Sequence, residues 1–226
     1  MVIKYIDINK YIDDNTIVFN CLETWCGEFK DMPQKIINNK IEIQDFVYCL
    51  EKSNVDVLCY HATRLTNEEI DNIKENGMLL PNKDTLYRKI NNNKYLIPEE
   101  KEILVNNLRL ENNRVNMQFF FTEHKGKTIY DNNDVSEPLN NYGGEIICNN
   151  KTREIIDKMD KYSYPCIIVA KVKCKDILPY NFYQIIENIF KNIDNNLSEI
   201  ALGISTRVSA KVLDVIKISK ETIIVK

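Results

Sequence analysis

Short apolar runs recur along the chain and predict the strands of a β-sheet. A compact run rich in β-branched and aromatic residues is typical of a buried strand. Such runs lie at residues 16–21, 55–63, 117–122, 142–148, 165–172, 211–218 and 222–225. The run at residues 165–172 is the most strand-like, and the last two runs are expected to close the sheet.

The polar stretches between these runs carry helix signals, which are clearest at residues 66–77. Thr66 and Glu69 have the spacing of a capping box, in which each side chain binds the other residue's backbone N–H. Ile70 and Ile73 supply an apolar face, and Gly77 is placed to end the helix.

Four further helices are predicted, at residues 41–51, 99–112, 151–161 and 181–195. Pro98 can open the second of these helices, because proline is favoured at the first helical position. Ile103, Leu104 and Leu108 are expected to face inward.

Strands and helices mix without the regular alternation of a doubly wound fold, and no glycine-rich phosphate loop is present. The pattern therefore predicts the α+β class. Residues 1–53 are expected to form an N-terminal strand and helix segment packed on a main α+β domain of residues 54–226.

Composition narrows the class of protein. The 226 residues are 44% hydrophobic and carry a net charge of -3, so a full core is expected, but not a protein that coats nucleic acid. No apolar run reaches the roughly 20 residues of a membrane helix, and the first 15 residues do not resemble a signal peptide. These features predict a cytoplasmic protein with no membrane contact. Abundant Asn, Lys and Ile are typical of an AT-rich bacterial or phage genome.

Seven cysteines are spread along the chain without the short paired spacing of a zinc site. Several lie in apolar runs, where a thiol packs as a small hydrophobic group. Reduced thiols and no metal are therefore expected.

His61 is the first candidate for chemistry, because it ends a predicted strand immediately before a capped helix. Strand ends that feed loops hold side chains in fixed directions and are common places for functional groups. A histidine satisfied by a backbone partner is the competing interpretation.

Three segments taken in order resemble the ADP-ribosyltransferase fold, in particular its His-Tyr-Glu branch, which includes the poly-ADP-ribose polymerases. The resemblance implies a split antiparallel sheet with flanking helices. The segments are Tyr60-His61-Ala62-Thr63, then Phe119-Phe120-Phe121-Thr122-Glu123 with Lys127-Thr128-Ile129-Tyr130, and Tyr142-Gly143-Gly144-Glu145-Ile146-Ile147.

The resemblance implies an NAD-dependent enzyme, with NAD as a substrate and Glu145 as the catalytic carboxylate. Phe120 stands where the branch has its motif tyrosine, so a hydroxyl contact is missing. The implied NAD-binding residues are His61, Thr63, Phe120, Tyr130 and Tyr142.

The chemistry implied is cleavage of the nicotinamide–ribose bond. Aromatic faces can stack on the cationic nicotinamide ring, and a carboxylate can stabilise the positive charge that develops on the ribose. ADP-ribose would then pass to a macromolecule (a protein or nucleic acid) or to water. A role as a toxin or in conflict between phage and bacterium suits a small enzyme of this kind by association.

Two other functions remain open at this point. His61 and His124 could act as the base and acid of a metal-independent RNase, although Lys125-Gly126 after His124 leaves that motif half complete. Alternatively, the chain is an inactive protein that binds a partner through its Phe-rich strand and the helix at residues 181–195. Glu199 is a rival carboxylate, expected to face solvent on a helix.

Overall fold

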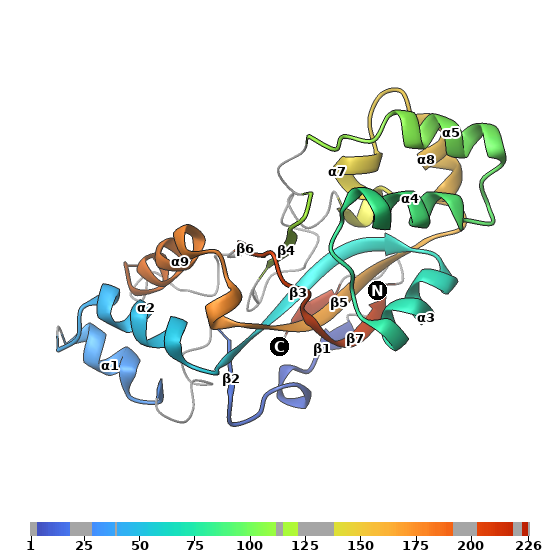
Figure 1. Ribbon diagram of the computed structural model, residues 1–226. Coiled ribbons are helices and arrows are strands. Elements are labelled where there is room, and N and C mark those ends of the chain that lie inside the picture. The colour runs from blue at the N-terminus through green and yellow to red at the C-terminus, as the bar shows by residue number, and fades with distance from the viewer. Residues whose placement is uncertain are drawn as a thin grey trace.

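A computed structural model describes residues 4–18, 29–38, 40–111, 115–121, 138–191, 203–218 and 223–225. The fold is mixed α+β, as predicted (Figure 1). The strands are β1 (Lys4–Ile6), β2 (Thr16–Ile17), β3 (Asp56–Leu65), β4 (Gln118–Phe121), β5 (Tyr164–Lys173), β6 (Gly203–Thr206), β7 (Lys211–Lys217) and β8 (Ile223–Val225). The α-helices are α1 (Met32–Ile37), α2 (Ile43–Lys52), α3 (Asn67–Asn76), α4 (Lys83–Asn91), α5 (Pro98–Asn106), α7 (Gly144–Ile147), α8 (Arg153–Met159) and α9 (Pro179–Lys191). Single 3-10 turns lie at Ile8–Lys10 and Cys174–Asp176.

A six-stranded, mainly antiparallel sheet forms the centre. Five of its strands follow the order β6-β4-β3-β5-β7, and β2 pairs with β3 outside this order. β3 and β5 pair along ten residues, from Asp56 opposite Lys173 to Leu65 opposite Tyr164. The other edge of β3 is shared, because β2 pairs with its first residues in parallel and β4 pairs antiparallel at Tyr60. β3 is therefore held on both edges, which makes it a rigid support for His61.

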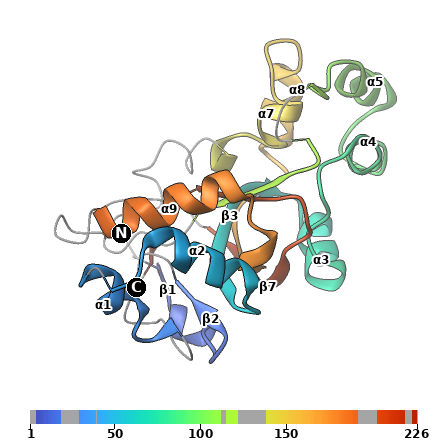
Figure 2. The ribbon, with the colours of Figure 1, turned by 60° about the vertical axis from the view of Figure 1, so that its left-hand side comes forward.

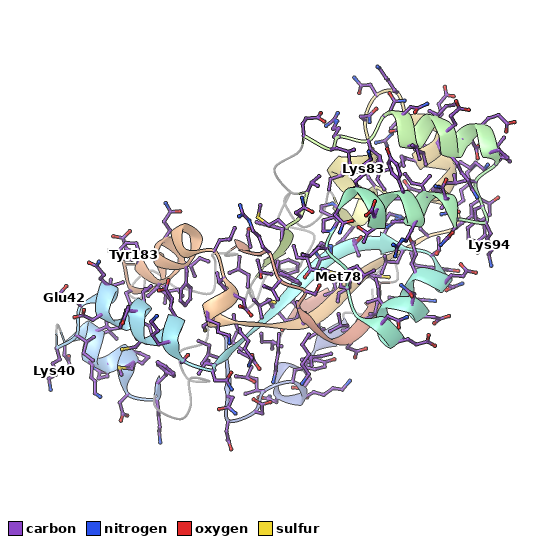
Figure 3. The ribbon with its side chains drawn as sticks, viewed as in Figure 1. Lys40, Glu42, Met78, Lys83, Lys94 and Tyr183 are labelled. Atoms are coloured by element: carbon purple, nitrogen blue, oxygen red, sulfur yellow. The ribbon has the colours of Figure 1, made fainter. Side chains whose placement is uncertain are left out.

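The helices form two groups at opposite ends of the β3–β5 pair (Figures 1 and 2). One group contains α1, α2 and α9, and its core joins Phe46 of α2 to Phe182 of α9 and to Val57 of β3. The other group contains α3, α4, α5, α7 and α8, and most of its apolar side chains form a separate cluster. Met78 lies beside β3 between the groups and packs against two of the core clusters (Figure 3).

The start and end of α3 confirm the local signals. The Thr66 hydroxyl accepts from the Glu69 backbone N–H, and Glu69 Oε2 accepts from the Thr66 N–H at 2.8 Å. Gly77 ends the helix with φ of 78°. Such a φ is in the left-handed region, where glycine has no steric cost.

The prediction of a strand at residues 142–148 is wrong. Gly143 and Gly144 both have positive φ and turn the chain into the short helix α7. Ile146 and Ile147 then pack into the cluster of the second helix group instead of entering the sheet. A short β-branched run fits either element, and here tertiary burial selected the helix.

Smaller differences concern other element bounds. The helix opened by Pro98 ends at Asn106, with Leu104 buried but Ile103 42% exposed. α4, α1, β1 and β6 were not predicted. The last strand, β8, pairs with β1 in a separate two-stranded sheet, so of the two terminal runs only the one that forms β7 joins the main sheet.

Two further features bear on the class of protein. None of the helices in the described ranges is long and apolar enough to cross a membrane. The described cysteines Cys49, Cys59, Cys148, Cys166 and Cys174 are free thiols. Burial raises the pKa of the Cys166 thiol to about 11, so this group is an inert core residue.

Candidate functional site

A cavity of about 880 Å³ lies where β3 meets the second helix group. His61 and Thr63 of β3 line it together with Phe119 and Phe121 of β4 and with Gly203 of β6. Its other walls come from α3, the turn after α3, α4 and the α7–α8 region. The volume falls within the range of about 300–1,000 Å³ that is typical of small-molecule sites.

The hydrogen bond of His61 restricts the tautomer of the ring. Its Nδ1 lies 2.7 Å from the backbone carbonyl oxygen of Phe119. A carbonyl only accepts, so Nδ1 donates the proton, and the neutral ring then has its acceptor at Nε2. The half-buried ring also meets the Phe120 ring edge-on, at 5.8 Å between centroids. Both contacts hold the imidazole in one orientation beside the cavity.

Thr63 follows His61 on the same face of β3, since alternate residues of a strand share a face. It also lines the cavity and is half-buried. No described residue hydrogen-bonds its hydroxyl. His61 and Thr63 are therefore brought together as the sequence predicted.

The Phe-rich strand divides its side chains between the cavity and the core. Phe120 is 0% exposed and packs with Phe182 and Ile204, so it is not among the lining residues. Phe119 and Phe121 do line the cavity. A Cβ on Gly203 would lie 2.5 Å from the Phe119 ring, so a larger residue at this position would clash with the ring.

Glu145 lies in α7, between two residues that line the cavity, Gly144 and Ile146. Its backbone is thus beside the cavity, but on a short helix and not on the strand that was predicted. Tyr130, His124 and Glu199 fall outside the described residues.

Tyr142 lies behind the cavity wall, with 2% of its surface exposed. Its hydroxyl donates to Glu69 Oε1 at 2.8 Å and accepts from Asn93 Nδ2 at 3.1 Å. Burial, with a smaller contribution from Glu69, raises the pKa of Tyr142 well above its usual value. Tyr142 thus joins α3 and α4 to the segment that leads into α7, and it does not itself line the cavity.

The cavity is basic although the chain is acidic overall. Among its described lining residues, five are Lys or Arg and two are Glu, whereas the whole chain carries a net charge of -3. Lys89 lies 3.0 Å from Glu69, and Lys94 pairs with Glu68. A cavity with an excess of positive charge favours an anionic ligand.

Sequence reasoning missed the basic residues of this wall because α4 was not predicted. The signals for α4 were present: Asn82 and Thr85 form a capping box, and Leu86 and Ile90 are buried four residues apart. On the cavity side, α4 presents a polar stripe at helical spacing. It consists of Thr85, Arg88, Lys89 and Asn92.

The described residues contain no group of three or more His, Cys, Asp or Glu side chains that could hold a metal ion. Comparisons with protein-family models, with curated proteins and with solved structures found no match for this chain. The geometry of the cavity and the resemblance in sequence are therefore what bear on function.

Proposed function

We propose that the cavity binds NAD and that the protein cleaves the nicotinamide–ribose bond as an ADP-ribosyltransferase-like enzyme. The observation that carries the proposal is one cavity lined by His61, Thr63, the Phe119 ring and the residues on either side of Glu145, under an excess of basic side chains. These are parts of the three segments that resemble the family.

Each part of a dinucleotide has matching chemistry here. Flat rings suit the half-buried Phe119 ring, which can stack on them, and Phe121, which is 7% exposed, adds a smaller aromatic area beside it. Ribose hydroxyls suit the His61 ring and the Thr63 hydroxyl, since both can exchange hydrogen bonds with them. Phosphates suit the basic wall. In this proposal the aromatic contact belongs to Phe119 and Phe121, because Phe120 is fully buried.

In the reaction, the bond between the nicotinamide nitrogen and the ribose carbon breaks, and its electron pair leaves with nicotinamide. Positive charge develops on the ribose, where a carboxylate stabilises it. An oxygen or nitrogen of the acceptor, or of water, then forms the new bond and loses its proton. We assign the carboxylate role to Glu145, and the same group can orient the acceptor.

The direct test is nicotinamide release from NAD by the purified full chain, with and without cell lysate. Glu145→Gln should lower the rate about 10²–10³-fold, the usual effect of removing one charge-stabilising group. His61→Ala should lower it less. A rate that requires lysate would indicate transfer to a macromolecule, whereas a rate that does not require it would indicate hydrolysis.

Glu199→Gln is the matched comparison, because Glu199 precedes β6 by only four positions in sequence and Gly203 of β6 lines the cavity. Loss of release in Glu199→Gln but not in Glu145→Gln would keep the reaction and reassign the carboxylate. No release by the folded wild type under any condition would overturn the proposal.

A further inference from the structure

Arg88 and Arg109 differ from the other charged residues of the cavity wall. Both side chains are exposed and line the cavity. In the described part of the chain neither has a hydrogen-bond or ion-pair partner for its guanidinium. By contrast, Lys89 pairs with Glu69, and Arg153 pairs with Asp157 at 2.9 Å. Among the described residues, the positive charge on the cavity wall that has no partner is therefore at these two positions.

Arg88 is carried by a well-anchored helix. The α4 N-terminus is closed by the Asn82–Thr85 capping box, and Leu86 and Ile90 are buried. Figure 3 labels Lys83, the first residue of α4, and Lys94, which follows the end of the helix. Because the buried stripe fixes the rotation of the helix, Arg88 has to extend from its polar side toward the cavity.

Arg109 is held on a different wall. Its backbone N–H donates to the Ile146 carbonyl of α7 at 3.0 Å. Leu108 and Leu110 on either side pack against the cluster of the second helix group, while Arg109 itself is exposed. The backbone is thus fixed, and only the side chain has freedom to adjust to a ligand.

The surroundings favour a small anion over a nucleic acid. α5 immediately precedes the Arg109 segment and presents Glu99 and Glu102 to solvent, with Glu100 bound to Lys158. Since Lys101 and Lys158 offset only two of its three carboxylates, α5 offers no excess of positive charge to a chain of phosphates that extends beyond the cavity. Two free guanidiniums on two walls instead match a short ligand with adjacent phosphates, since a planar guanidinium binds phosphate oxygens in pairs.

We propose that Arg88 and Arg109 together bind the diphosphate of a nucleoside-diphosphate ligand, with each guanidinium donating hydrogen bonds to phosphate oxygens. The assignment of these arginines to NAD rests on the proposed function. Binding of the diphosphate itself does not require that any bond be cleaved.

The test is calorimetric binding of ADP-ribose, ADP and adenosine to the full chain. Arg88→Gln and Arg109→Gln should each weaken ADP-ribose and ADP binding about tenfold or more, because hydrogen bonds between charged groups are the strong ones. Adenosine, which lacks phosphates, should bind equally to all variants. Arg207→Gln is the matched control, since Arg207 is an exposed arginine that does not line this cavity.

Salt provides a second readout. Raising the salt concentration should weaken ADP-ribose binding to the wild type more than to the Arg88→Gln/Arg109→Gln double variant. Salt screens the attraction between the two arginines and the phosphates, and the double variant lacks these two charges. Equal affinity of the wild type and the double variant for ADP-ribose, or no ADP-ribose binding by the folded wild type, would overturn the inference.

The outcome separates this inference from the proposed function. Arginine-dependent ADP-ribose binding without nicotinamide release would support the diphosphate site and contradict the proposed enzymatic activity. Nicotinamide release with ADP-ribose binding that ignores both arginines would keep the enzyme and remove the diphosphate site.

Discussion

At the scale of single residues, two adjacent glycines direct the chain into the cavity wall. Gly143 and Gly144 have φ values of 80° and 57°, in the left-handed region that other residues rarely adopt. They turn the backbone after the buried Tyr142 and place α7 beside the cavity. The position of Glu145 therefore depends on backbone freedom at these two glycines.

Alanine at these glycines should have unequal effects. Gly144→Ala has only the cost of the left-handed backbone, about 1–2 kcal/mol, because nothing lies within 4 Å of the added Cβ. Gly143→Ala should cost more, since its Cβ would lie 2.7 Å from Cβ of Ile147, which is 1% exposed and cannot move away. Urea unfolding of both variants gives the two free energies, and an equal or smaller cost for Gly143→Ala would contradict this packing.

Asp13 makes the free energy of unfolding depend on pH under acidic conditions. Hydrogen bonds from Lys171 and Thr16 lower the pKa of this carboxyl to about 2. A carboxyl with a lowered pKa stabilises the fold above its unfolded pKa of about 3.9. That contribution is lost as the pH falls through the folded value.

Asp13→Asn should therefore be less stable than the wild type at pH 7, and the difference should shrink between about pH 4 and pH 2. The Asp13 side chain is 64% exposed, so the part of the difference that changes with pH should stay below about 1 kcal/mol. Unfolding free energies measured across this range test the prediction, with exposed Asp71→Asn as control. A difference that does not change with pH would assign the effect to packing instead of charge.

At the scale of elements, the sequence predicted best where the signals were local. Thr66, Glu69 and Gly77 set the bounds of α3 from inside one short segment, residues 66–77, and the structure has the helix between Thr66 and Gly77. Ile146 and Ile147 carried a local strand pattern, but burial against α5 and α8 placed them in a helix. Such packing depends on partners that are distant in sequence, which no local window contains.

Arg64 joins two elements that the sequence did not connect. From β3 it reaches Asp160 after α8, with Nε 3.2 Å from Oδ1, and its Nη1 donates to the Leu139 carbonyl at 3.1 Å. Its Nη2 donates to the carbonyls of Asp160 and Ser163 at 2.7 and 2.8 Å. This one side chain, 15% exposed, ties the α7–α8 region to the sheet.

Arg64→Ala should cost about 3 kcal/mol, because it removes the ion pair of Asp160 and the guanidinium donors of three carbonyls. Arg64→Lys should recover only part of this, since one ammonium cannot reproduce the fork of a guanidinium. Urea unfolding measures both values, with Arg207→Lys as the control on an exposed arginine. A fully stable Arg64→Lys would show that charge alone is sufficient at this position.

At the scale of the whole molecule, the cavity forms only when the chain folds and brings separate elements together. His61 and Thr63 could be found in the sequence because two positions on one strand share a face. Arg88 and Arg109 could not, since they reach the cavity from separate walls. The core likewise crosses the predicted boundary at residue 53, where Ile17 and Phe46 pack in one cluster with Val57 and Phe182.

The central claim is that this cavity binds NAD, and equilibrium binding of NAD to the full chain tests it most directly. Calorimetry on Glu145→Gln, in which cleavage should be slow, should show one NAD bound per chain. Adding His61→Ala to this variant should weaken binding about tenfold, the value of one hydrogen bond, while adding Arg207→Gln should leave the affinity unchanged. No NAD binding by folded Glu145→Gln, or an affinity unchanged by His61→Ala, would contradict the account.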